Sequence, residues 1–362
     1  MNSAPTRVTA LDGLRGVACL AVLLMHIGSV LRPFGESPLY ALIPGTPAVM
    51  VFFALSGVVL SLAPLCRQRE GRAYDWLSYF PRRVVRLCVP LFAAIALGIA
   101  AGWVAWRLGA TSRSAVAIDF AAPAATVVHD VLMQFDVLFN VSDDLLTLTG
   151  APLVRVNSPV WSMSWELWFS LTLPLALWFL TRVRKDAAAA LAILAGIFVS
   201  FWSGYFPLRL CLMFWLGILL AKYADELSRV RINPAAELAA TAGLLAAASA
   251  FRFTEGMGGA THALASTAMC AASAGLVALT MTDGLVRRAL SCRACQALGR
   301  LSFSIYLTHA VVVSGIGIVG PRLGIGAPLA QAALALAGSL GFAWVFWRLV
   351  EKPSMDLSRR IR

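Results

Sequence analysis

The chain has 362 residues, of which 59% are hydrophobic and only 13% are charged, a balance too apolar for a water-soluble enzyme. Its Gly and Pro contents are ordinary and no short repeat recurs, which excludes collagen, coiled coil and disorder. The net charge of +12 would elsewhere suggest nucleic-acid binding, but in a membrane protein such an excess orients loops toward the cytoplasm. We therefore expect an all-α, polytopic protein whose partner is the lipid bilayer and not nucleic acid.

Ten stretches of the chain are apolar and long enough to cross a bilayer as helices. They cover residues 14–32, 47–65, 89–107, 161–181, 187–203, 207–221, 235–252, 261–282, 302–319 and 328–350. With the N-terminus inside, 23 of the 30 Lys and Arg residues fall on the cytoplasmic side, as the positive-inside rule requires. Both termini are therefore predicted to be cytoplasmic.

A shorter apolar piece, residues 127–139, carries Asp130 and Asp136. Because the chain must return to its starting side there, the piece is predicted to be re-entrant or interfacial. No linker or second domain follows the last span, so residues 1–362 are expected to form one membrane domain.

The seven cysteines are scattered, and the pair Cys292 and Cys295 is too small a ligand set for zinc, which usually takes four ligands. No disulfide framework and no metal site are predicted. The chain also lacks an ATP-binding loop and a His-Glu-x-x-His helix, so neither ATP-driven pumping nor metalloprotease chemistry is supported.

Ionisable residues within a membrane span are candidates for function because they are costly to bury. Arg15 and His26 lie eleven positions apart on the first span, which brings them within about 20° of one helical face and separates them by about 16 Å along the axis. They are predicted to face one cavity, with Arg15 at the cytoplasmic interface and His26 beyond the midplane. Histidine can accept a proton from a hydroxyl near neutral pH, and a structural buried histidine is the alternative.

Glu166 is predicted to lie at the same depth as His26, since the fourth span starts at the outer face at Trp161. A carboxylate at that depth would orient the imidazole and raise its basicity. The preceding segment 158–165 supplies hydroxyls and indole N–H groups, including Ser164 and Trp161. Interfacial anchoring is the alternative for the tryptophans.

The loop between residues 67 and 86 is the most basic segment. Arg82, Arg83 and Arg86 share one side of a predicted helix start, and clustered guanidiniums suit phosphate. The alternative is that these arginines only set the membrane topology or contact anionic lipid head groups. Ser304, Tyr306 and His309 in the inner half of the ninth span, with Glu351 closing the tenth at the cytoplasmic surface, are predicted to complete a polar inner vestibule.

Five motifs in this chain resemble the signatures of the acyltransferase 3 family of integral membrane O-acyltransferases. They are Leu11–Gly16 with His26, Phe52–Gly57 with Ser56, Arg82–Leu87, Pro159–Glu166 and Leu301–His309. The resemblance implies ten membrane helices with cytoplasmic ends, as the charge count does. It also implies that Arg15, His26 and Glu166 belong to the reaction centre, and Arg83 and Arg86 to the coenzyme-binding loop.

The family resemblance further implies transfer of an acyl group, commonly acetyl, from cytoplasmic acyl-CoA to a hydroxyl. Acetyl-CoA would be a substrate, with no permanently bound cofactor. The expected acceptors are sugars of lipopolysaccharide, exopolysaccharide or peptidoglycan, or secreted small molecules such as macrolides, and the expected location is the bacterial inner membrane. No fused SGNH esterase domain follows the last helix, unlike in some relatives.

The leading hypothesis is a membrane O-acyltransferase with His26 as general base supported by Glu166. A secondary transporter or flippase for a lipid-linked sugar or small molecule would use the same intramembrane residues as proton-coupled substrate sites. Inverted repeats would favour the transporter, and none is apparent.

Overall fold

A computed structural model describes residues 9–36, 40, 43–110, 118–138, 155–254 and 256–361. Within these ranges the chain forms helices and no strand, and nine helices are long and apolar enough to cross a membrane. The expected all-helical, polytopic fold is confirmed. The predicted span 207–221 forms α8 (Phe206–Lys222), which is about 26 Å long at 1.5 Å per residue and so slightly shorter than the hydrocarbon core of about 30 Å.

The chain divides into two compact units. The first comprises the described residues within Met1–Val22, Pro44–Trp76 and Phe169–Ser302, and the second those within Leu23–Ile43, Leu77–Trp168 and Phe303–Arg362. The prediction of one domain over residues 1–362 stays a prediction.

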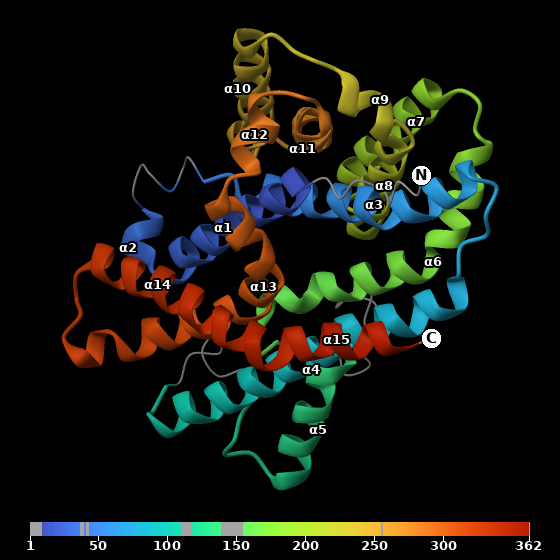
Figure 1. The fold of residues 1–362 in the computed structure, drawn as a ribbon. Helices are drawn as coiled ribbons and strands as arrows, with labels where there is room; N and C mark the ends of the chain where they lie inside the picture. Colours follow the sequence, from blue (N-terminus) through green and yellow to red (C-terminus); the bar gives the residue numbers. More distant parts are fainter. Residues whose placement is uncertain are drawn as a thin grey trace. The chain divides into compact units, whose positions relative to one another are not determined.

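The first unit is built around α8. The helices wholly within this unit are α3 (Gly45–Arg69), α7 (Asp186–Ser203), α8, α9 (Ala224–Arg229), α10 (Pro234–Ala250), α11 (Gly259–Met281) and α12 (Leu285–Leu290), with the 3₁₀ turn η4 (Phe251–Thr254) between α10 and α11. The N-terminal parts of α1 (Thr9–Val30) and α13 (Arg293–Val319) and the C-terminal part of α6 (Ser162–Arg182) also belong to it. α8 packs against α3 and α7, and α11 packs against α3, α7 and α10 (Figure 1).

Two glycines allow the backbones of α3 and α8 to touch. A Cβ atom at Gly217 would lie 2.1 Å from the Ala54 carbonyl oxygen, and one at Gly57 would lie 2.1 Å from the Phe214 carbonyl oxygen. Small residues permit such close approach between membrane helices. The Phe52–Gly57 motif therefore has a packing role through its glycine.

Gly217→Ala is expected to lower the melting temperature of the detergent-purified protein, because overpacking a tight contact costs about 1–3 kcal/mol. Gly243→Ala on α10 is the matched control, since a Cβ there would meet no atom within 4 Å. Thermal unfolding followed by size-exclusion chromatography measures both. Equal melting temperatures for the two variants would contradict the packing role.

The second unit contains the remaining helices and the other parts of the helices that the two units share. They are the C-terminal part of α1 (Thr9–Val30), α2 (Arg32–Gly35), α4 (Trp76–Arg107, apart from its first residue), α5 (Ala124–Gln134), the start of α6 (Ser162–Arg182), the C-terminal part of α13 (Arg293–Val319), α14 (Pro328–Phe346) and α15 (Lys352–Arg360). Short 3₁₀ turns are η2 (Phe135–Leu138), η3 (Ser158–Trp161) and η5 (Pro321–Leu323).

Three predicted boundaries are corrected. α4 begins at Trp76 and not at 89, and α13 begins at Arg293 and not at 302. The last span does not end at 350, because α14 continues through a π-helical turn, η6 (Trp347–Glu351), into α15 (Figure 1). Hydropathy identifies only the lipid-compatible part of a helix, whereas the basic ends of these helices continue the same hydrogen-bonded backbone.

The apolar piece predicted over residues 127–139 forms α5 and η2 up to Leu138, and residue 139 lies outside the described residues. Its re-entrant or interfacial placement stays a prediction. Gln134 at the end of α5 is buried, and its side-chain oxygen accepts the Val156 N–H at 2.9 Å. This hydrogen bond ties α5 to the segment that leads into η3.

Candidate active site

The second unit brings two histidines into contact. Nδ1 of His26 on α1 lies 3.3 Å from Nε2 of His309 on α13, and the ring centroids are 4.9 Å apart in an edge arrangement. His309 is fully buried and His26 is half-buried. His309 is also anchored on its own helix, where its Nδ1 lies 2.9 Å from the Ile305 carbonyl oxygen.

This histidine pair was not predicted, because the sequence analysis placed His26 beyond the midplane and His309 in the inner half of its span. The early start of α13 removes that difference. Each histidine lies about 25 Å along its own helix, measured from Thr9 or from Arg293 at 1.5 Å per residue. The two imidazoles are therefore at matching positions on their helices.

Tyr306 connects α13 to the start of α6. Its hydroxyl donates to the Pro159 carbonyl oxygen, and the Ser162 hydroxyl oxygen lies 2.7 Å from the tyrosine oxygen. Because the single phenolic proton is used by the carbonyl, Ser162 is the donor in the second bond. The Tyr306 ring centroid lies 6.0 Å from that of His309, so Tyr306 joins the histidine pair to α6.

The turn before α6 is buried in protein, and the predicted entry of this span at the outer face of the membrane stays a prediction. Asn157 is fully buried, and its Nδ2 donates to the Leu307 carbonyl oxygen at 2.6 Å. Leu307 is near the middle of α13. Irregular backbone is tolerated at such depth where protein buries it, and a hydropathy window does not register this arrangement.

Glu166 forms an ion pair with Arg83. Nη2 of Arg83 on α4 donates to Oε1 of Glu166 on α6, and the side chains are 12% and 19% exposed. The sequence analysis had placed these residues near opposite membrane faces, so the pair was missed. The His26–Glu166 pairing and the phosphate-binding role of Arg83 stay predictions.

The other two arginines of the α4 motif are more accessible than Arg83. Arg82 and Arg86 are exposed, and Nε of Arg82 donates to the Ile361 carbonyl oxygen at 2.9 Å. All three lie within α4, as the predicted helix start requires. The motif therefore combines a half-buried arginine on Glu166 with two exposed ones.

Glu351 is buried within the protein, and its predicted position at the cytoplasmic surface of the membrane stays a prediction. It occupies the π-helical turn between α14 and α15 and accepts a hydrogen bond from the Ser304 hydroxyl. π-helical turns often occur at functional sites. Ser304, Tyr306, His309 and Glu351 thus belong to one unit, whereas the vestibule predicted from them stays a prediction.

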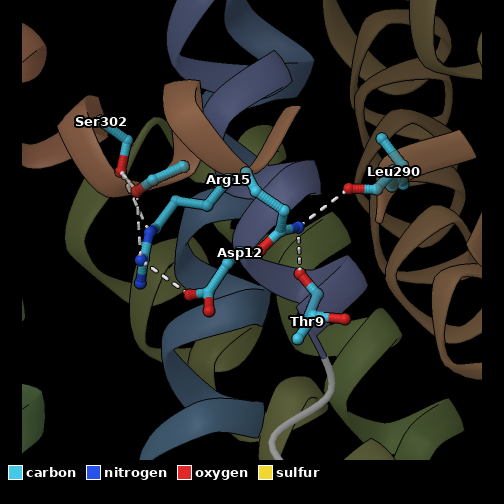
Figure 2. A network of polar contacts seen from close by, with 7 residues as sticks. Thr9, Asp12, Arg15, Leu290 and Ser302 are labelled. Carbon is cyan, nitrogen blue, oxygen red and sulfur yellow. Dashed lines mark hydrogen bonds and ion pairs between the residues drawn. The ribbon is translucent and has the colours of Figure 1, made fainter. Parts of the chain in front are cut away.

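Arg15 belongs to the first unit, where it ties α1 to α13. Its Nε donates to the Ser302 hydroxyl at 3.1 Å, and its Nη2 donates to Oδ1 of Asp12 at 2.8 Å and to the Gly299 carbonyl oxygen at 3.3 Å (Figure 2). A Cβ at Gly299 would lie 2.2 Å from the Asp12 carbonyl oxygen, so the two backbones touch here. The Arg15 side chain is 31% exposed. The shared cavity predicted for Arg15 and His26 stays a prediction.

The remaining predicted residues are Ser56, Trp161 and Ser164. Ser56 is half-buried on α3 in the first unit. Ser164 is buried and donates its hydroxyl to the Trp161 carbonyl oxygen at 2.8 Å. Its proton is therefore used at the start of α6, and its place among the site residues stays a prediction.

Sequence reasoning gave no role to Asp12, Asn157, Ser162 or Ser302. Asp12, Ser162 and Ser302 lie inside motifs already singled out, so the motifs were the available signal. Asn157 lies two residues before the Pro159–Glu166 motif. A polar residue beside a buried turn has no distinguishing pattern in sequence.

The fold and this site define a polytopic membrane protein that holds a histidine pair and an arginine–glutamate pair within one helical unit. The family model for acyltransferase 3, described as an acyltransferase domain, matches residues 8–348. The chain therefore belongs to the acyltransferase 3 family of membrane acyltransferases, as its motifs suggested. It is 28% identical to Acyltransferase MdmB of Streptomyces mycarofaciens over 98% of this chain and 94% of that protein. No solved structure matches the chain.

Proposed function

We propose that this acyltransferase moves an acetyl group from cytoplasmic acetyl-CoA to a hydroxyl of a cell-surface or exported glycan, working in the bacterial inner membrane. His26 is the general base, and Glu166 supports the reaction centre. The observation that carries the proposal is the half-buried His26 paired with His309 in the unit that also holds Tyr306, Arg83 and Glu166.

The chemistry follows from what an imidazole can do. His26 takes the proton of the acceptor hydroxyl while its oxygen forms a bond to the thioester carbonyl carbon. The carbon–sulfur bond then breaks, and the imidazolium returns the proton to the departing coenzyme thiolate. The products are an O-acyl ester and free coenzyme A, so the base is regenerated in each cycle.

The phosphate groups of coenzyme A need cationic side chains that are exposed to solvent. Arg82 and Arg86 are exposed on the first turns of α4. Arginine binds phosphate with two parallel hydrogen bonds. We assign Arg82 and Arg86 to donor binding. Arg83 is assigned mainly to Glu166, because its guanidinium is already engaged there.

The experiment that tests this function uses the full chain in proteoliposomes with acetyl-CoA carrying a labelled acetyl group. Acceptors are an exopolysaccharide repeat unit, a lipopolysaccharide O-antigen fragment and a macrolide. We expect label in a base-labile ester on one acceptor, with one coenzyme A released per acetyl transferred. Labelled succinyl-CoA in parallel tests the acyl group.

Three outcomes would overturn parts of the proposal. Transfer of succinyl but not acetyl would overturn the donor, and label only on the macrolide would overturn the glycan acceptor. Accumulation of unmodified glycan inside the vesicles, with no ester formed, would indicate a transporter instead.

A further inference from the structure

The hydrogen bonds around His309 determine which of its nitrogens carries the proton. Its Nδ1 lies 2.9 Å from the Ile305 carbonyl oxygen, and a carbonyl only accepts hydrogen bonds. Nδ1 of His309 is therefore protonated. A neutral imidazole has one N–H group, and complete burial leaves no water to solvate a charged ring. Nε2 of His309 thus presents a lone pair.

That lone pair faces Nδ1 of His26 at 3.3 Å. Since one proton must lie between the two nitrogens, Nδ1 of His26 is the donor. A neutral His26 then carries its own lone pair on Nε2, the nitrogen on the far side of the ring from His309. The Nδ1–H of His26 therefore donates to Nε2 of His309, and the Nδ1–H of His309 donates to the Ile305 carbonyl oxygen.

We propose that His309 is a positioning residue that fixes the tautomer of His26, so that Nε2 of His26 is the atom that accepts the substrate proton. This inference rests on the proposed function of His26 as general base. When Nε2 of His26 gains the proton, the N–H on Nδ1 still donates to His309, whose lone pair then stabilises the imidazolium. His309 keeps the same protonation state throughout the reaction. The carboxylate of a catalytic triad does the same, since it orients its histidine without becoming protonated itself.

A catalytic test compares two variants whose side-chain amide groups occupy the positions of different ring nitrogens of His309. The amide of His309→Gln reaches the position of Nε2 and offers a carbonyl oxygen to the Nδ1–H of His26. The amide of His309→Asn reaches only the position of Nδ1. We expect His309→Gln to keep turnover within about tenfold of wild type and His309→Asn to lose about 10²-fold or more, by analogy with the tautomer loss in serine proteases.

The Michaelis constants for donor and acceptor should change little in either variant, because the orientation of the base matters mainly in the transition state. A purely structural role predicts a different pattern: the apolar His309→Leu variant, whose side chain is similar in volume to histidine, would fold and retain turnover. Equal turnover for His309→Gln and His309→Asn, with both proteins monodisperse, would overturn the inference.

A second measurement does not depend on activity. The chain has four histidines, so the protein labelled with ¹⁵N at histidine gives four imidazole signal sets, which single variants assign. Solid-state spectra of the wild type in lipid should show Nδ1 of His26 protonated and Nε2 bare at neutral pH. The reverse tautomer would refute the positioning role even if transfer depends on His26. The expected tautomer with full activity in His26→Ala would instead refute the proposed function.

Discussion

His26→Ala is expected to reduce acyl transfer about 10²–10⁴-fold, which is the usual contribution of a general base. Binding of the donor should be nearly unchanged, because the base acts on the acceptor hydroxyl. His26 is half-buried and hydrogen-bonded to His309, so its ring is held in one orientation. Turnover of labelled acetyl-CoA and calorimetric binding of coenzyme A measure the two effects separately.

His129→Ala is the matched control, since His129 is exposed and its Nδ1 lies 3.2 Å from Oδ1 of Asp130. Removing it should leave transfer at the wild-type level. Full activity in a monodisperse His26→Ala protein would exclude His26 as the base. A loss of donor binding equal to the loss of turnover would instead assign His26 to substrate binding.

The helical, polytopic fold followed from composition because apolar segments of the right length have few alternatives in a bilayer. The residues that carry charge inside those segments could also be identified, since burying them is costly. Arg15, His26, Glu166 and His309 were all singled out on that ground. The identity of the buried polar residues can therefore be predicted from the sequence.

The partners of those residues could not be predicted, because two side chains meet only if they lie at matching positions along their helix axes. Hydropathy placed the start of α13 nine residues too late and so put His309 at a different level from His26. It also gave no indication that Asn157 and Pro159, which lie next to the span predicted from Trp161, contact the middle of α13. A shift along a helix axis decides which side chains meet.

The Arg83–Glu166 pair shows the chemical consequence of these shifts. From sequence, Glu166 was assigned to the imidazole and Arg83 to phosphate, because each seemed to lie on its own side of the membrane. In the structure the carboxylate accepts a hydrogen bond from the guanidinium. Glu166 therefore has a cationic partner, and the Arg83 guanidinium is less available to bind the phosphates of a coenzyme.

Arg83→Ala and Arg86→Ala are expected to differ in kind. Arg83→Ala removes a partly buried, charge-assisted hydrogen bond and should cost about 1.5–3 kcal/mol of stability, with a fall in turnover because Glu166 loses its anchor. Arg86→Ala removes an exposed phosphate contact and should raise the Michaelis constant for acetyl-CoA about 10–100-fold. Its turnover at saturating donor should fall little, because that contact is equally present in ground and transition states.

Glu166→Gln completes the comparison by keeping the shape of the side chain while removing its charge. If the pair acts as a unit, Glu166→Gln and Arg83→Ala should each lower the melting temperature and turnover, and the double variant should lose less than the sum of the two. The Arg359→Ala protein is the control, since Arg359 is exposed and its ion pair with Asp356 lies on the exposed side of α15, where such a pair contributes little to stability. Strictly additive losses, together with a raised donor constant in Arg83→Ala, would return Arg83 to the coenzyme site and leave Glu166 to act on His26.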